Sequence, residues 1–248
     1  MNLSNSSIIR AFLLSLSLLT RLPVMLPNNI DSDDSGRSAL FYPLVGLILG
    51  LMVLLPIGVF PNTSPILLGA IVVALWAATT GGLHLDGLAD SADAWLGGMG
   101  DREKTQRIMK DPLVGAAGVI AVVCVLLLKF SAVVALLQDS YLWGIVLAPV
   151  MARSMVLLLF LTSEYVSSQG LAHHVVDYLP RTIAWGILIA VSVMCGFFSV
   201  YGTLLALIGF WLIRRLSLKR LGGYTGDVAG VVVEITEMLF LVGCGLAV

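Results

Sequence analysis

Residues 113–137 read LVGAAGVIAVVCVLLLKFSAVVALL, in which Lys129 is the only charged side chain. A helix of about 20 mostly apolar residues is long enough to cross the hydrocarbon core of a bilayer. The whole chain has a similar character, with 58% hydrophobic and 12% charged residues, whereas soluble domains average about 25% charged residues. The sequence therefore predicts an all-α, polytopic transmembrane helix bundle.

Further apolar runs bring the expected number of spans to about seven. They are Ala39–Phe60, Pro65–Thr80, Tyr141–Thr162, Thr182–Phe198, Tyr201–Ile213 and Val228–Val248. The sequence from Thr182 to Ile213 is too long for one crossing, so we expect a break near Ser199–Gly202 between two short helices. The N-terminal stretch Ile8–Leu19 is too short to span and is interrupted by Arg10. This pattern predicts an amphipathic helix lying in the membrane interface.

The distribution of basic residues predicts the orientation of the bundle. With seven crossings, one side receives the segments Arg21–Arg37, Arg102–Lys110, Glu164–Arg181 and Arg214–Arg220. Of the 14 Lys and Arg, only Lys129 and Arg153 fall inside spans, and all the others fall on that side. The positive-inside rule makes it the cytoplasmic side.

The chain contains no polar linker, so we expect residues 1–248 to form a single domain in the cytoplasmic (inner) membrane, with its active site facing the cytoplasm. A net charge of −1 gives no reason to expect a nucleic-acid partner. The sequence does not determine the oligomeric state.

Residues 81–98, GGLHLDGLADSADAWLGG, contain the most informative acidic motif. Asp86, Asp90 and Asp93 are spaced i, i+4 and i+7, which places them on one face of a helix. No Lys or Arg lies among them, so the carboxylates repel one another unless a cation binds, and oxygen ligands favour Mg²⁺, Mn²⁺ or Ca²⁺. A solvated helix N-terminus, which also favours Asp, explains Asp86 but not all three. His84 is a candidate catalytic residue, with a structural role as the alternative.

A second acidic set, Asp227, Glu234 and Glu237, lies at the start of the last apolar run. Acids inside spans are candidate functional groups, so we expect Asp227 and Glu234 to contribute to the metal site. We also expect Asp227 to share a cavity with Asp86, close to Arg153. The alternative is that these acids pair with Arg153 or another buried base. The sequence leaves the role of Lys129 undecided.

Two glycine-rich segments, residues 110–118 (KDPLVGAAG) and 219–227 (KRLGGYTGD), combine a base with the start of a helix. Exposed backbone N–H groups at such a site can bind phosphate, although glycines also serve close packing of membrane helices. The candidate substrate-binding residues are Lys110, Arg153, Lys219, Arg220, Gly222, Gly223 and Thr225.

Taken together, these segments resemble the cobalamin synthase family, adenosylcobinamide-GDP ribazoletransferase. The resemblance covers nearly the whole chain. It rests on residues 20–23 (TRLP), 41–46 (FYPLVG), 81–94 (GGLHLDGLADSADA), 110–118 and 222–227 (GGYTGD), followed by Glu234. It implies an integral membrane enzyme that condenses adenosylcobinamide-GDP with α-ribazole, or its 5′-phosphate, and releases GMP with the help of Mg²⁺.

This reaction suggests a role for each candidate residue. A ribose hydroxyl of α-ribazole would attack the phosphorus nearer the cobinamide, and Asp86, Asp90 or His84 would accept its proton. The expected metal ligands are Asp86, Asp90, Asp93, Asp227 and Glu234.

Two other functions remain as alternatives at this point. A CDP-alcohol-type membrane phosphotransferase also has an Asp-Gly pair, but Asp86-Gly87 is not followed by the Ala-Arg of that class. A cation transporter would use the acids as an ion path, yet here they gather at one membrane boundary.

Overall fold

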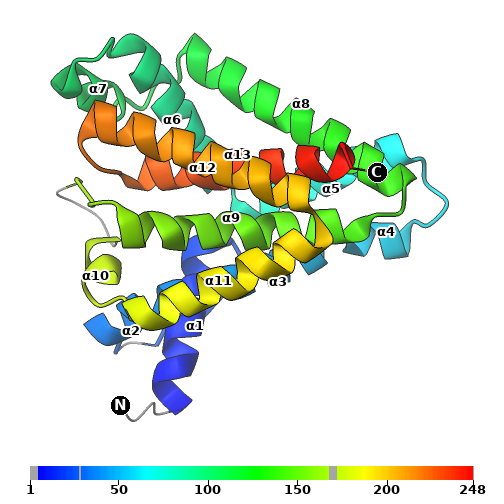
Figure 1. Cartoon of the computed structure of the whole chain (residues 1–248), viewed down its shortest axis with the longest axis horizontal. Helices are drawn as coiled ribbons and strands as arrows, with labels where there is room; N and C mark the ends of the chain where they lie inside the picture. The colour runs from blue at the N-terminus through cyan, green and yellow to red at the C-terminus, as the bar shows by residue number, and fades with distance from the viewer. Residues whose placement is uncertain (1–4, 28, 168–171, 248) are drawn as a thin grey trace.

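The computed structural model is a bundle of helices (Figure 1). It describes residues 5–27, 29–167 and 172–247, without the side chains of residues 5–6 and 172–174. The helices, in chain order, are α1 (Asn5–Leu19), α2 (Ser32–Ser38), η1 (Ala39–Phe41), α3 (Tyr42–Val53), α4 (Leu55–Val59), α5 (Pro65–Thr80), α6 (Leu83–Gly97), α7 (Arg102–Ile108), α8 (Ala116–Gln138), α9 (Leu142–Thr162), α10 (Ala172–Asp177), α11 (Arg181–Phe198), α12 (Val200–Leu221) and α13 (Gly226–Gly245).

The described chain contains six helical stretches that are long and apolar enough to cross a membrane, and a seventh if α5 and α6 are counted as one bent span. The first of the six, Ser32–Val59, consists of the consecutive helices α2, η1, α3 and α4. The predicted all-α polytopic bundle is therefore confirmed, and the predicted break near Ser199 falls between α11 and α12. The prediction that the second helix of this pair is short was wrong, because α12 continues to Leu221.

Two helices, α9 and α13, form the centre of the bundle. The apolar stretch of α9 is 94% buried and that of α13 is 72% buried, whereas that of α11 is 17% buried. Glycine permits the close approach of α3 to α9, because a Cβ atom at Gly46 would lie 2.4 Å from the carbonyl oxygen of Pro149. Small residues commonly allow such contacts between membrane helices.

A glycine pair sets the direction of α6. Gly81 and Gly82 have φ angles of +63° and +69°, a left-handed conformation that glycine adopts at little cost. Consequently α5 ends at Thr80, and α6 begins at Leu83 after a bend of 87°. The acidic motif therefore lies on a helix of its own beyond the crossing helix α5.

The segments with most of the basic residues gather at one end of the bundle. Figure 1 shows α2, α7 and α10 at this end, with α4 and the C-terminus at the opposite end. We call it the basic end. Helix α1 runs crosswise to the long helices (Figure 1) and is fixed to α2 by a 2.5 Å salt bridge between Arg10 and Asp34. Its location in the membrane interface stays a prediction.

Candidate active site

The N-terminal turns of α6 and α13 cross in backbone contact. A Cβ atom at Gly87 of α6 would lie 2.8 Å from both Cα and the carbonyl oxygen of Asp227. One turn further along α13, a Cβ atom at Gly230 would lie 3.0 Å from the carbonyl oxygen of His84. Two segments about 140 residues apart in sequence therefore meet at glycines, which leaves their acids side by side.

This crossing borders a cavity of about 260 Å³ that is lined by Asp86, Asp227 and His84. We call it the acidic cavity. Apolar side chains such as Leu19, Val156 and Phe160 form other parts of its wall. His84 is buried, and its Nδ1 has no hydrogen-bond partner among the described residues. The structure thus brings Asp86 and Asp227 to one cavity, together with a buried histidine whose Nδ1 has no partner among the described residues.

Asp90 lies one turn beyond Asp86 on α6 and is partly buried. Burial, followed by the charges of Asp86, Asp227 and Asp93, raises the pKa of Asp90 to about 6. Three neighbouring carboxylates thus oppose its ionisation, which is the electrostatic setting that a bound cation would relieve. Among the described residues, however, no three Asp, Glu, His or Cys side chains lie close enough together to hold a metal ion by themselves.

Asp93, the third acid of the motif, caps a neighbouring helix. Its two carboxylate oxygens accept hydrogen bonds from the backbone N–H groups of Gly115, at 2.7 Å, and Gly118, at 2.9 Å. These groups belong to the otherwise unpaired N–H donors at the start of α8. The structure therefore gives Asp93 a capping role, and its place in the metal site stays a prediction.

Glu234 lies in a buried charge cluster that also contains Glu237, Lys129 and Arg153. Lys129 Nζ donates to Glu234 at 2.6 Å and to Glu237 at 2.5 Å, and Arg153 forms a salt bridge with Glu237. The two acids balance the two bases, as buried charges require. The structure thus shows the pairing of acids with buried bases that the sequence left as the alternative, while Arg153 Nε and Nη2 have no partner among the described residues. That Glu234 binds metal, and that Arg153 balances Asp86 and Asp227 or binds substrate, stay predictions.

Asp227 also lines a second cavity, of about 310 Å³, at the α13 N-terminus. We call it the Lys110 cavity, because Lys110 contributes its cationic side chain. Thr225, the N-cap residue of α13, also lines it, and its hydroxyl donates to Asp227 at 3.3 Å. The structure thus groups two of the predicted substrate-binding residues beside one of the acids.

The second glycine pair shapes the turn between α12 and α13. Gly222 has a φ angle of +78° and ends α12, while Gly223 packs against the backbone of Glu164. Tyr224 follows, and its N–H donates to the Glu164 carbonyl at 2.9 Å. These contacts give both glycines a role in the chain turn. Lys219 and Arg220, in the last turn of α12, line neither the acidic cavity nor the Lys110 cavity.

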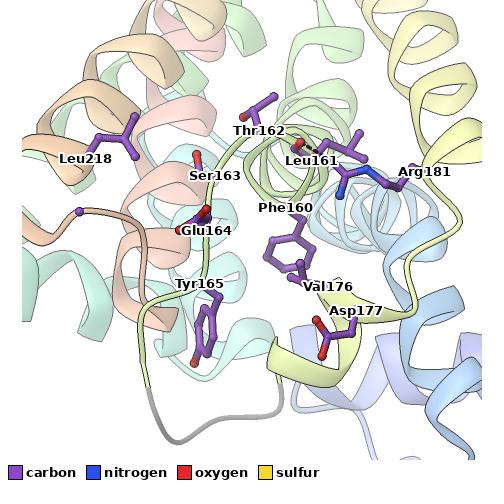
Figure 2. Close-up of a pocket in the computed structure, with 11 residues that line it drawn as sticks. Phe160, Leu161, Thr162, Ser163, Glu164, Tyr165, Val176, Asp177, Arg181 and Leu218 are labelled. Carbon is purple, nitrogen blue, oxygen red and sulfur yellow. Dashed lines mark hydrogen bonds between the residues drawn. The ribbon is translucent and has the colours of Figure 1, made fainter.

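Gly222 and Glu164 also border a wider cavity of about 750 Å³ at the basic end, apart from Asp86 and Asp227. Figure 2 shows its lining, with Arg181 turned to the end of α9, where it donates to the Leu161 carbonyl at 2.7 Å. Although this cavity is wider, we do not assign the reaction to it, because Asp86 and Asp227 do not line it.

Comparison with known proteins identifies the family. Residues 11–245 match the family model of cobalamin-5-phosphate synthase. The chain belongs to this family.

Curated relatives of the cobalamin-5-phosphate synthase family match almost end to end. A protein of Stutzerimonas stutzeri (strain A1501) is 46% identical over 95% of this chain and 98% of its own length. A protein of Pseudomonas fluorescens (strain Pf0-1) is 45% identical over 94% of this chain and 98% of its own. Both are named adenosylcobinamide-GDP ribazoletransferase. No solved structure matches the chain.

Sequence reasoning left two features of this cobalamin-5-phosphate synthase family member unassigned. The sequence alone does not assign a role to Lys129. The available signal is charge balance: Lys129 is a lone base in one span, Glu234 and Glu237 are acids one helical turn apart in another, and charges inside a membrane must be neutralised. Arg21 was part of the TRLP motif but was not a site candidate. Its side chain packs against Gly81 and borders a cavity that also includes Asp86.

Proposed function

We propose that this chain is an adenosylcobinamide-GDP ribazoletransferase, the activity for which its relatives are named. It transfers the phosphocobinamide group of adenosylcobinamide-GDP to α-ribazole, or to its 5′-phosphate, in the final joining step of cobalamin synthesis. The observation that carries this proposal is the shared cavity of Asp86 and Asp227 in a member of this family.

The reaction exchanges one phosphorus–oxygen bond for another. A ribose hydroxyl oxygen of α-ribazole bonds to the phosphorus nearer the cobinamide, while the bridging bond of the diphosphate breaks and its electron pair leaves with GMP. The hydroxyl proton passes to the protein. His84 is the group in the acidic cavity with an unpartnered nitrogen, so we assign it as the proton acceptor.

The acids at the crossing of α6 and α13 fit Mg²⁺. Asp86, Asp90 and Asp227 come from two helices, supply hard oxygen ligands and have no described base paired with them. Phosphate oxygens of the substrate would complete the coordination, since Mg²⁺ commonly binds through one or two carboxylates and phosphates. When bound, the ion supplies charge neutralisation for the diphosphate.

The neighbouring Lys110 cavity suits the departing GMP. The Lys110 ammonium can pair with phosphate, and Gln106 and Thr225 supply polar groups in the same wall. Guanine carries several hydrogen-bond donors and acceptors, so it needs such polar surroundings. Asp227 lines both this cavity and the acidic cavity. The phosphate of GMP would therefore move away from Asp227 and toward Lys110.

We further propose that the chain lies in the cytoplasmic (inner) membrane with the basic end, and hence the active site, facing the cytoplasm. The support is the concentration of Lys and Arg in the segments at that end, as the positive-inside rule requires.

The direct test is turnover by the purified protein. Adenosylcobinamide-GDP, α-ribazole and Mg²⁺ should give adenosylcobalamin and GMP in equal amounts, and removal of Mg²⁺ with EDTA should stop the reaction until excess Mg²⁺ is added. Release of GMP without the joined product would refute the proposal. Transfer from a CDP-alcohol, or cation uptake into proteoliposomes, would instead support one of the two alternative functions.

A further inference from the structure

A third cavity, of about 470 Å³, lies on the other side of Asp86, between α6 and α8. We call it the apolar cavity, because Val119, Val122 and Val123 of α8 form one wall and Leu83, Leu85 and Ala89 belong to α6. Its volume lies within the range of about 300–1,000 Å³ that is usual for small-molecule sites. Among its lining residues, Arg21 and Asp86 carry the only charged side chains.

The wall chemistry selects the kind of ring that can bind. The valine and leucine side chains offer no hydrogen bonds, and a buried polar group without a partner costs about 1–3 kcal/mol. Guanine would leave several polar groups unpaired against this wall. The base of α-ribazole is a benzimidazole with two methyl groups, which presents mainly apolar carbon and gains from contact with branched aliphatic side chains.

The position of the cavity connects it to the reaction. Asp86 and Leu83 line both the apolar cavity and the acidic cavity, so the two spaces adjoin at the carboxylate proposed to hold Mg²⁺. A nucleoside with its base among the valines can therefore extend its ribose toward Asp86. The ribose is the part of α-ribazole that must reach the diphosphate.

Arg21 supplies a cation at the same cavity. Its backbone N–H donates to the Thr79 carbonyl at 2.8 Å, and its side chain lies so close to Gly81 that a Cβ atom there would be 2.4 Å from Arg21 Cγ and Nε. Arg21 forms no salt bridge with an acid in the described part of the chain. Its guanidinium is thus available to a phosphate, which it binds through paired N–H groups.

We propose that the apolar cavity binds α-ribazole, with the base against the α8 valines, the ribose at Asp86 and the 5′-phosphate, when present, at Arg21. This inference rests on the proposed function and extends it, since it places the two substrates on opposite sides of Asp86. Adenosylcobinamide-GDP then occupies the side of the acidic cavity and the Lys110 cavity.

The test is the KM for each substrate in a variant with a smaller apolar cavity. Val122→Phe adds volume inside the cavity and should raise the KM for α-ribazole at least about tenfold, equivalent to about 1.4 kcal/mol of binding, with the KM for adenosylcobinamide-GDP unchanged. Ile120→Phe is the matched control, because Ile120 is exposed on the same helix and does not line the cavity. It should leave both KM values unchanged. If Val122→Phe does not fold, Val122→Thr keeps the volume, adds a hydroxyl and should raise the same KM.

A second variant tests the proposed phosphate contact. Arg21→Gln should raise the KM for α-ribazole 5′-phosphate more than that for α-ribazole. The inference is overturned if the cavity-filling variant changes only the KM for adenosylcobinamide-GDP, or if it changes neither KM, as expected of Ile120→Phe. It is also overturned if Arg21→Gln affects the two acceptors equally. In each of these cases, turnover by the wild-type protein would still uphold the proposed function, whereas no wild-type turnover would refute the function itself.

Discussion

At the scale of single residues, the three acids of the motif on α6 have different surroundings. Their spacing correctly predicts a helix with Asp86, Asp90 and Asp93 on one stripe. The sequence does not show that the N-terminus of α8 meets this stripe at Asp93, because that contact depends on how two helices pack. Asp86, by contrast, faces two cavities. Local spacing therefore identified the stripe, and tertiary packing decides what each acid does.

Asp93→Asn and Asp86→Asn should consequently have opposite effects. Asn at position 93 retains one acceptor oxygen for two N–H donors and should lower stability by about 1 kcal/mol, the usual scale for a helix cap, while turnover persists. Asn at position 86 should reduce turnover by at least about a hundredfold, since a metal ligand is lost, with little change in thermal unfolding. Melting temperature in detergent and initial rate measure the two effects. Loss of turnover in Asp93→Asn at full stability would restore Asp93 to the metal site.

At the scale of helices, α13 is held by two kinds of contact, a buried charge cluster and close backbone packing at glycine. The cluster of Lys129, Glu234, Glu237 and Arg153 joins α13 to α8 and α9, while Gly87 brings α6 onto Asp227. The sequence predicted each acid and base inside a span but not which of them pair, because spans of similar composition can pack in many orders. Pairing became visible only with the helices in place.

The charge cluster makes a stability prediction. Lys129→Met leaves Glu234 and Glu237 with Arg153 alone, and an uncompensated buried charge should destabilise the protein by about 3–5 kcal/mol. Adding Glu234→Gln should recover much of that loss, because the remaining Glu237–Arg153 pair is balanced. Thermal unfolding of the single and double variants measures this coupling. Equal stability of Lys129→Met and wild type would show that the cluster is not an ion network.

The glycine contact makes a prediction about activity. A Val side chain at position 87 has no room beside the Asp227 backbone, so Gly87→Val should push α6 away from α13 and abolish turnover. Gly186→Val is the control, because Gly186 on α11 has no atom within 4 Å of an added Cβ, and its turnover should be normal. Initial rates at saturating substrate compare the two variants. Normal turnover in Gly87→Val would mean that the close crossing is not required.

At the scale of the whole molecule, hydropathy predicted the helices well and their directions less well. The predicted run Pro65–Thr80 matches α5, and the break at Ser199 also agrees. The 87° bend after Thr80 was not predicted, because a glycine pair permits many chain directions. The distribution of basic residues predicts the orientation of the bundle, which stays a prediction.

Reporter fusions test this topology. A reporter fused after Gln138 should read as external and one fused after Arg215 as cytoplasmic, because the basic segments lie on one side. The two fusion points lie toward opposite ends of the bundle. At each point, an alkaline phosphatase fusion and a fluorescent fusion should give opposite activities. Cytoplasmic readings at both positions would contradict the seven-span arrangement.

We propose that α6 and α13 together build one metal-dependent reaction site. The most direct measurement is the Mg²⁺ concentration that gives half-maximal turnover in Asp227→Asn and in wild type. Because Asp227 lies about 140 residues from Asp86 in sequence but lines the same cavity, removing its charge should raise this concentration at least about tenfold, or about 1.4 kcal/mol of binding. An unchanged Mg²⁺ dependence in Asp227→Asn would contradict the claim and separate the two acidic segments.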